Sequence, residues 1–463
     1  MKQIFLFLML SIGILSISYA QNANIDRARA LEIYSNIISF RTASGQGKVP
    51  EMASYLAAQL NQAGFSDNNI HILPVNETAA LVVRYQGDGS SNKKPILFLA
   101  HMDVVDATPD EWDHEPFTLS QDETFFLGRG TSDNKYGVMN LTQSFIRLKL
   151  QGFVPNRDLL LVFSGDEETT QATTRMLVKD RKDLVDAEFA LNSDSGGGSL
   201  AQSGIPLTYH YQAAEKTYAT FEITASNPGG HSARPRKDNA IYELAEAILN
   251  IRNYQFPVKS NAIVRQSHRA EGEQLGGDLG EALVRYADNP EDELAVQTIL
   301  ANEDYDDTIR TTCVATLLRG GQVENALPQA ATATVNCRIF PGTQVQEVMN
   351  TLVNIIANDS IKIVPLDDYI ASPVSQPRED VTNAIATAVH QRYPNMQLVP
   401  SMSSGYTDAL IYRRAGIPTF GSSAKIVGPE PSNAHGINER FPIKAFYDGL
   451  DHWVHIIYSL AGK

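Results

Sequence analysis

Three runs of apolar residues in the first half of the chain each end in side chains that can bind metal. The runs and the polar residues after them are 96–100 with His101 and Asp103, 159–163 with Asp166, Glu167 and Glu168, and 189–191 with Asp194. Short continuous apolar runs are typical of strands buried on both faces of a sheet. Because parallel strands present their carboxyl ends at one edge, we expect these polar side chains to gather there.

Apolar residues at helical spacing alternate with these runs along the chain. The predicted helices are two within residues 25–65, separated by a loop at 42–48, then 137–150, 381–393 and 445–460; further strands are predicted at 79–85 and 418–422. This alternation predicts an α/β domain with a mostly parallel sheet covered on both faces.

The pattern changes near residue 214. Phe221, Ile223 and Ala225 alternate with polar residues, which is typical of a sheet with one face in water. Strands at 219–225, 312–318, 331–339 and 361–363, a helix at 239–252 and a second helix opened by a Thr343–Gln346 capping box predict a four-stranded, two-helix α+β domain.

The expected domain boundaries follow from these two patterns. The α/β domain would comprise residues 21–213 and 367–463, and the smaller domain residues 214–366, with an acidic helical insertion at about 255–310. A length of 463 residues suits more than one domain. The net charge of −15 argues against nucleic-acid partners, because phosphate binding depends on Lys and Arg.

Residues 1–20 have the features of a signal peptide. Lys2 precedes an apolar stretch, residues 4–17, and Ser18-Tyr19-Ala20 ends it with a small residue, so we expect cleavage after Ala20 and a secreted or periplasmic protein. The alternative is an uncleaved membrane anchor, although the stretch is short for a span of about 20 residues.

The only two cysteines, Cys313 and Cys337, lie on two predicted strands. In an oxidising compartment they could pair across a hairpin, or they could remain buried free thiols; the sequence leaves both open.

Charged side chains at the ends of buried strands need a compensating partner, because burying unpaired charge costs several kcal/mol. A divalent cation is one such partner. The adjacent Glu167 and Glu168 point in different directions from an extended backbone, so one can bind metal while the other acts as a general base. Taken singly, Asp133 and Asp194 are also typical of turns.

Taken together, the motifs resemble a known family. His101-x-Asp103, Gly128-Arg129-Gly130-x-x-Asp133-x-Lys135, Glu167-Glu168, Asp194 and a late His435 resemble the dizinc M20 metallopeptidases, most closely the carboxypeptidase S branch. The family fold is a zinc-binding α/β domain interrupted by a lid that is often a dimerisation module. The resemblance therefore agrees with the two patterns above and suggests a homodimer through the lid, although the sequence leaves open whether the lid pairs two chains.

The resemblance also implies roles at a two-metal centre. Asp133 would bridge two Zn²⁺ ions, or Co²⁺ or Mn²⁺ in their place. His101 and Asp194 would complete one site, and Glu168 and His435 the other. Glu167 would be the general base for a metal-bridging water, and Asp103 would hold the His101 ring in one tautomer. The peptide bond before Asn134, where many members carry Asp, would be cis.

The lid would supply the substrate-binding residues. His231, in Asn227-Pro228-Gly229-Gly230-His231-Ser232, matches the histidine that reaches the substrate carbonyl, usually in the neighbouring protomer's site. Asn325 and Arg338 match positions that hold the terminal carboxylate. Gly405 lies in Ser404-Gly405-Tyr406-Thr407-Asp408, where Tyr406 replaces a glycine common in the family and puts the shape of the substrate pocket in doubt.

We therefore expect zinc-dependent hydrolysis of short peptides with a free terminal carboxylate, by a carboxypeptidase or dipeptidase. The alternatives are an N-acyl-amino-acid amidohydrolase, which would need the same metals and Arg338, and a catalytically silent metal- or peptide-binding homologue. Neither Gly-x-Ser-x-Gly nor His-Glu-x-x-His occurs in the sequence, which disfavours a serine hydrolase and a gluzincin.

Overall fold

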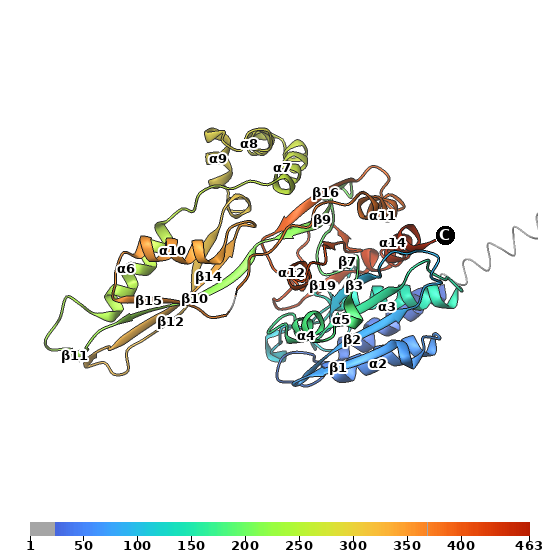
Figure 1. Cartoon of the computed structure of the whole chain (residues 1–463), viewed down its shortest axis with the longest axis horizontal. Helices are drawn as coiled ribbons and strands as arrows, with labels where there is room; N and C mark the ends of the chain where they lie inside the picture. The colour runs from blue at the N-terminus through green and yellow to red at the C-terminus, as the bar shows by residue number, and fades with distance from the viewer. Residues whose placement is uncertain (1–23, 368) are drawn as a thin grey trace, which may run out of the picture. The chain divides into compact units, whose positions relative to one another are not determined.

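The computed structural model describes residues 24–367 and 369–463, so the predicted signal peptide lies outside the described residues (Figure 1). The chain forms two compact units. The first unit comprises the residues up to Tyr211 together with Pro377–Leu398 and Ile417–Lys463, and the second comprises Gln212–Gln376 and Val399–Gly416. Over the described part of the chain, no helix is both long enough and apolar enough to cross a membrane.

A large sheet forms the centre of the first unit. Its order is β1-β2-β6-β3-β7-β17-β9-β8-β18, with β16 paired to β9. The bounds are β1 Ile70–Val75, β2 Thr78–Tyr85, β3 Ile96–His101, β6 Leu159–Ser164, β7 Phe189–Asn192, β8 Gly197–Leu200, β9 Pro206–Glu215, β16 Gln397–Ser403, β17 Thr419–Gly421 and β18 Ile426–Val427. The three apolar runs are thus the neighbouring strands β6, β3 and β7, parallel to one another and fully buried, which confirms the predicted fold class.

Helices cover this sheet. They are residues 24–39, α2 Val49–Gln62, α3 Lys135–Leu150, α4 Ala172–Asp180, α5 Lys182–Val185, α11 Glu379–His390, α13 Ile443–Asp448 and α14 His452–Ala461. Phe98 of β3 packs edge-on against Phe145 of α3 and Trp453 of α14, which fixes these two helices on the sheet.

The single helix predicted over 445–460 is wrong, because α13 ends at Asp448 and α14 begins at His452. Asn140 of α3 donates a hydrogen bond to the carbonyl of Gly449, 3.0 Å away. In a continuous helix that carbonyl would accept the backbone N–H four residues later. A side chain distant in sequence therefore interrupts a locally favourable helix.

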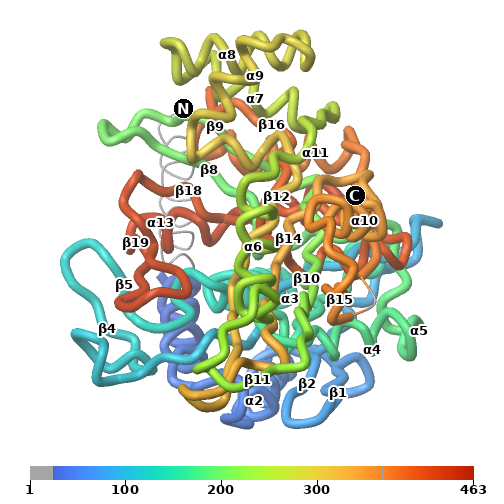
Figure 2. Tube along the Cα trace, turned by 90° about the vertical axis from the view of Figure 1, so that its left-hand side faces the viewer, coloured from blue at the N-terminus to red at the C-terminus, as the bar shows by residue number. Residues whose placement is uncertain are grey.

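The second unit contains a four-stranded antiparallel sheet in the order β12-β14-β10-β15. Its strands are β10 Thr217–Ser226, β12 Thr312–Gly320, β14 Ala330–Ile339 and β15 Ile361–Pro365, and its helices are α6 Ala240–Asn253 and α10 Val345–Ile356. Figure 2 shows α6 running along these strands, and both helices share one apolar core with the sheet. The predicted four strands and two helices are confirmed.

The predicted capping box of α10 is off by one residue at each position. The box uses Gln344 and Glu347 rather than Thr343 and Gln346, because Thr343 lies in a turn and donates its N–H to the carbonyl of Phe340. Cys313 and Cys337 face each other on β12 and β14 and form a disulfide.

The helical insertion between α6 and β12 contains α7 Ala262–Leu275, α8 Gly277–Asp288 and α9 Glu293–Leu300. Its helices share an apolar core, which includes Val264, Leu283, Tyr286 and Ile299 together with Phe340, the residue after β14. The insertion is therefore a packed helical subdomain of the second unit.

Candidate metal centre

The metal-competent side chains of the first unit come from the carboxyl ends of its central strands. His101 is the last residue of β3, Glu167 and Glu168 follow β6, and Asp194 follows β7. Asp133 lies just before α3, and His435 lies in the loop before β19 (Arg440–Pro442). The fold thus brings five segments to one edge of the sheet, as parallel strands predict.

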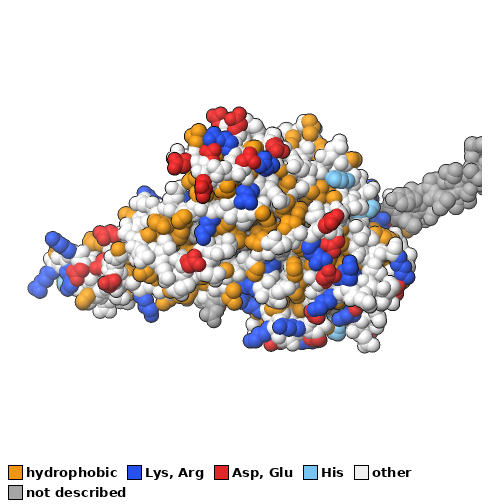
Figure 3. All heavy atoms as spheres, turned by 45° about the horizontal axis from the view of Figure 1, so that its top comes forward, with side chains coloured by type: hydrophobic (Ala, Val, Ile, Leu, Met, Phe, Trp, Pro, Cys, Tyr) orange, Lys and Arg blue, Asp and Glu red, His pale blue; other side chains and the backbone are white. Residues whose placement is uncertain are grey.

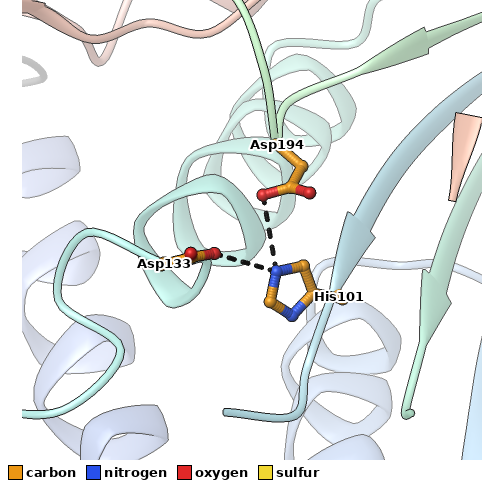
Figure 4. A group of neighbouring side chains, drawn as sticks. All are labelled: His101, Asp133 and Asp194. Atoms are coloured by element: carbon orange, nitrogen blue, oxygen red, sulfur yellow. Dashed lines mark hydrogen bonds and ion pairs between the residues drawn. The ribbon is translucent and has the colours of Figure 1, made fainter. Parts of the chain in front are cut away.

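Asp133 lies between the two histidines. Its Oδ1 is 3.0 Å from His101 Nε2, and its Oδ2 is 3.2 Å from His435 Nε2. His101 Nε2 is also 3.4 Å from Asp194 Oδ1, as Figure 4 shows, and His435 Nε2 is 2.9 Å from Glu168 Oε1. One carboxylate therefore joins two groups of donor atoms.

Each group has its donor atoms within 4.8 Å of one another. The groups are His101 with Asp133 and Asp194, and Asp133 with Glu168 and His435; a third, His101 with Glu167 and Glu168, brings in the predicted general base. All five predicted ligands and Glu167 thus lie together.

The carboxylates at this centre raise the pKa of both histidines. Burial lowers the pKa of His101, but Asp194, Asp103 and Asp133 outweigh it and leave that pKa well above its ordinary value. Hydrogen bonds to Asp133 and Glu168 raise the pKa of His435 to about 10. Protons on the two rings thus supply positive charge where three carboxylates converge.

A metal ion can supply that charge instead of the protons. Imidazole nitrogen and carboxylate oxygen are donors that Zn²⁺ and related divalent ions accept, and metal binding displaces ligand protons. The residues present therefore fit a pair of divalent metals that share Asp133.

Asp103 contacts both the His101 ring and the backbone of the Glu167-Glu168 pair. Its carbonyl oxygen is 3.0 Å from His101 Nδ1, and its carboxylate oxygen is 3.5 Å from the same atom. The carboxylate also accepts hydrogen bonds from the backbone N–H groups of Glu167, at 3.1 Å, and Glu168, at 2.9 Å. Asp103 thus fixes the position of the Glu167-Glu168 pair, a contact that the sequence did not indicate.

Glu439 is a second organising residue, and the sequence interpretation missed it. The side chain is fully buried and accepts hydrogen bonds from Arg129 Nη1 (2.7 Å), Gly130 N (2.9 Å), Ser132 N (2.7 Å) and Asp133 N (2.9 Å). It therefore holds the loop that presents Asp133. The available signal was the charged Arg129 in an otherwise neutral Gly-Arg-Gly turn, since a buried guanidinium needs an anion.

The next residue, Asn134, also contacts the centre. The peptide bond between Asp133 and Asn134 is cis, as expected from the resemblance. The Asn134 side chain donates a hydrogen bond to Asp194 Oδ1 at 2.6 Å, so it orients one of the candidate ligands.

The predicted lid residues lie in two places within the second unit. His231 belongs to the short strand β11 (Gly230–His231), which pairs with β13 (Ala326–Leu327), so Asn325 lies beside it. Both are exposed, and Figure 3 shows charged side chains of both signs at this end of the unit.

Arg338 lies near the far end of β14, opposite Tyr218 of β10. Eight residues of strand separate Arg338 from Ala330, at the β13 end, which is about 26 Å. A single lid therefore does not bring Arg338 together with His231 and Asn325. Gly405, in the Ser404–Asp408 loop of the same unit, donates its N–H to Ser403 Oγ at 3.0 Å.

The comparisons with known proteins agree on one family. The Peptidase family M20/M25/M40 model matches residues 97–459. A probable carboxypeptidase S-like 2 of Dictyostelium discoideum is 28% identical over 390 residues, covering 82% of this chain and 74% of that protein. The N-fatty-acyl-amino acid synthase/hydrolase PM20D1 of Bos taurus is 26% identical over 364 residues, covering 76% and 71%.

Solved structures share the fold. An M20 family metallo-carboxypeptidase from Sulfolobus solfataricus superposes with a TM-score of 0.68 at 19% identity, covering 92% of this chain and 98% of that chain. A dinuclear metal-binding peptidase of the M20 family from Bacillus subtilis superposes with a TM-score of 0.58 at 15% identity, covering 94% and 98%.

Proposed function

Because the chain belongs to peptidase family M20/M25/M40, we propose that it hydrolyses amide bonds in short peptides with a free terminal carboxylate, as a carboxypeptidase or dipeptidase. The observation that carries the proposal is the Asp133 carboxylate, whose two oxygens face His101 and His435 at 3.0 and 3.2 Å. A carboxylate that belongs to both donor groups can supply one oxygen to each of two metal ions.

In this proposal His101 and Asp194 would hold one ion, Glu168 and His435 would hold the other, and Asp133 would serve both. We propose Zn²⁺, with Co²⁺ or Mn²⁺ as substitutes, because the donor set mixes imidazole and carboxylate. When bound, such ions polarise the scissile carbonyl and lower the pKa of a water molecule.

Glu167 is the proposed general base. It is buried at the carboxyl end of β6 and belongs to one group with His101 and Glu168. The Asp103 carboxylate holds the Glu167 backbone N–H, so the side chain starts from a fixed position. Glu167 would take the proton from the attacking water and pass it to the leaving amine.

Arg338 is the proposed anchor for the substrate carboxylate. Its Nη1 is buried and has no hydrogen-bond partner among the described residues. A guanidinium edge in that state can bind a carboxylate through two parallel hydrogen bonds.

We further propose that two chains form each complete site. Along β14, Arg338 lies about 26 Å from Ala330, the end of the strand that follows β13 and His231, so one lid does not bring both residues to the same dipeptide. The edge strand β12 also exposes Val314, Leu317 and Leu318 along an unpaired side, which a second copy of the sheet could cover. His231 and Asn325 would then come from the partner chain, and light scattering should give the mass of a dimer.

An N-acyl-amino-acid amidohydrolase is the second candidate, favoured by the similarity to the PM20D1 protein. It needs the same ions, the same base and the same carboxylate anchor, so geometry alone does not separate the two. Rates on dipeptides and on N-acyl amino acids of the same C-terminal residue distinguish them.

We also propose that residues 1–20 are a signal peptide cleaved after Ala20. The disulfide between Cys313 and Cys337 suits the oxidising compartment to which such a peptide would direct the chain. The N-terminal sequence of the secreted protein tests the cleavage.

The test of the proposed chemistry is Glu167→Gln in the zinc-loaded protein. The amide cannot accept the water proton, so kcat should fall at least 10²-fold, the usual lower range of general-base contributions, with zinc content unchanged. The exposed Glu123→Gln is the matched control and should keep full rate. Retained activity in Glu167→Gln would remove Glu167 from the mechanism, and wild-type protein inert on both substrate panels would favour a silent homologue.

A further inference from the structure

Three aromatic side chains gather beside the proposed carboxylate anchor in the second unit. The Arg338 guanidinium carbon lies 4.7 Å from the centre of the Tyr218 ring, which stands directly opposite it on β10. The Tyr218 ring is 5.7 Å from that of Tyr406 and 6.4 Å from that of Tyr369. The first separation is that of a cation–π contact, and the other two are within the range of favourable aromatic pairs.

This cluster is partly open to solvent, although its rings are large. Tyr218 retains 36% of its surface exposed, and Tyr406 and Tyr369 are half-buried. The rings therefore have apolar area left to cover. Burial lowers the pKa of Arg338 while Tyr218 and Tyr406 act to raise it, so a carboxylate would be a favourable addition beside the guanidinium.

The loop that carries Tyr406 is fixed at both ends within the same unit. Lys216 N donates to the Ser403 carbonyl at 3.0 Å, and Glu215 accepts hydrogen bonds from Thr407 N and Oγ1, at 3.0 and 3.2 Å. Glu215 is itself paired with Arg413 at 2.8 Å, and both side chains are fully buried.

The Glu215–Arg413 ion pair restrains the position of Tyr406, because Glu215 also binds the neighbouring Thr407. Breaking such a pair leaves an uncompensated buried charge, so the loop has little freedom to move while the pair holds. Tyr406 is also the residue at which the loop departs from the glycine common in the family.

We propose that Tyr406 and Tyr218 form a wall that recognises the side chain of the substrate's C-terminal residue. This inference rests on the proposed function, because Arg338 must hold the terminal carboxylate. That side chain branches from the atom next to the carboxylate. A carboxylate bound at Arg338 therefore places it beside the Tyr218 ring, 4.7 Å from the guanidinium carbon, and that ring lies 5.7 Å from the ring of Tyr406. The wall selects aromatic and large aliphatic C-terminal residues over alanine.

The experiment compares kcat/KM for N-acetyl-Phe, N-acetyl-Leu and N-acetyl-Ala, and for the matching glycyl dipeptides. The wild-type chain should prefer Phe and Leu to Ala by at least tenfold. Tyr406→Gly, which restores the family's residue, should lower the Phe:Ala ratio about five- to tenfold, the upper part of the range for one aromatic contact. Tyr406→Phe should keep the ratio within about twofold.

Two further variants separate recognition from general damage. Tyr218→Ala, on another segment, should shift the ratio in the same direction as Tyr406→Gly. The exposed Tyr242→Ala on α6 should leave it unchanged. A wild-type enzyme without preference, or a Tyr406→Gly enzyme that retains it, would overturn the proposal.

If no substrate is turned over, that result counts against the proposed function alone. The wall is then tested by direct binding. Calorimetric titration of N-acetyl-Phe and N-acetyl-Ala into the mature chain should give the same preference and the same loss of it in Tyr406→Gly. Equal affinities for the two ligands would overturn the wall independently of catalysis.

Discussion

Glu439→Gln is the substitution that most sharply tests how the loop under Asp133 is held. The glutamine has the same shape but replaces one carboxylate oxygen with an NH2 group. One oxygen of Glu439 accepts from Arg129 and Gly130, and the other from Ser132 and Asp133. Whichever way the amide points, two backbone or guanidinium donors will face another donor.

The magnitude follows from the buried charge that remains. The side chain of Arg129 is 3% exposed, and removing one partner of a buried ion pair costs about 3–5 kcal/mol. Arg129 keeps a hydrogen bond to the Gly436 carbonyl at 2.8 Å and a stacking contact with Trp112 at 5.0 Å. These contacts favour the lower end, so we expect a loss of about 3 kcal/mol in the free energy of unfolding of the first unit.

Urea unfolding of the metal-free protein, followed by tryptophan fluorescence, measures this loss. The chain has two tryptophans, Trp112 and Trp453, and both lie in the first unit. Removing the metal keeps ligand binding from masking the change in stability. A chelator competition should also show weaker zinc binding, because in either orientation of the amide the loop that presents Asp133 loses two of its four hydrogen bonds to residue 439.

The exposed Glu123→Gln is the matched control and should change the unfolding free energy by less than about 0.5 kcal/mol. A loss below about 1 kcal/mol in Glu439→Gln, with unaltered zinc affinity, would refute the view that Glu439 holds the Asp133 loop.

Two further predictions concern the second unit. Burial lowers the pKa of His268 to about 4, below its ordinary 6.5, so the unfolded chain binds the extra proton first and stability falls as pH drops from 6.5 towards 4. At pH 5 this amounts to about 2 kcal/mol, and His268→Gln should show a correspondingly smaller acid loss between pH 7.5 and 5.0 in urea titrations; equal losses would contradict it. The disulfide closes a loop with a sequence separation of 24, so the Cys313→Ser/Cys337→Ser double variant should lose about 3 kcal/mol. Dithiothreitol should lower the melting temperature of the wild type in the same way, and an unchanged melting curve would argue against that stabilisation.

The sequence predicted the elements whose pattern is local. β3, β6 and β7 are continuous apolar runs, because a strand that is buried on both faces has apolar residues at nearly every position. The metal-competent residues at the ends of these strands were predictable for the same reason, because parallel strands bring their carboxyl ends to one edge.

The residues that hold the site in shape were not predictable, because their partners are distant in sequence. Glu439 contacts Arg129 across 310 positions and lies in a polar loop where a carboxylate is ordinarily solvated. The carboxylate of Asp103 was expected to serve His101, yet it also binds the backbone of Glu167 and Glu168. Such contacts depend on the assembled fold and leave no periodic signal.

The separation of His231 from Arg338 was hidden for a related reason. Their motifs indicate one substrate, but only the fold shows that they lie at opposite ends of β14, along which Ala330 and Arg338 are about 26 Å apart. A sequence motif records which residues are present and gives no information on which copy of the chain supplies them.

The number of ions bound per chain tests the proposed metal pair most directly. Mass spectrometry of the zinc-loaded, desalted wild-type protein should find two zinc ions per chain, and His435→Ala, which removes a ligand from one group only, should retain one. A wild-type chain that holds fewer than two ions, or a His435→Ala chain that still holds two, would contradict the assignment of these side chains to a shared pair.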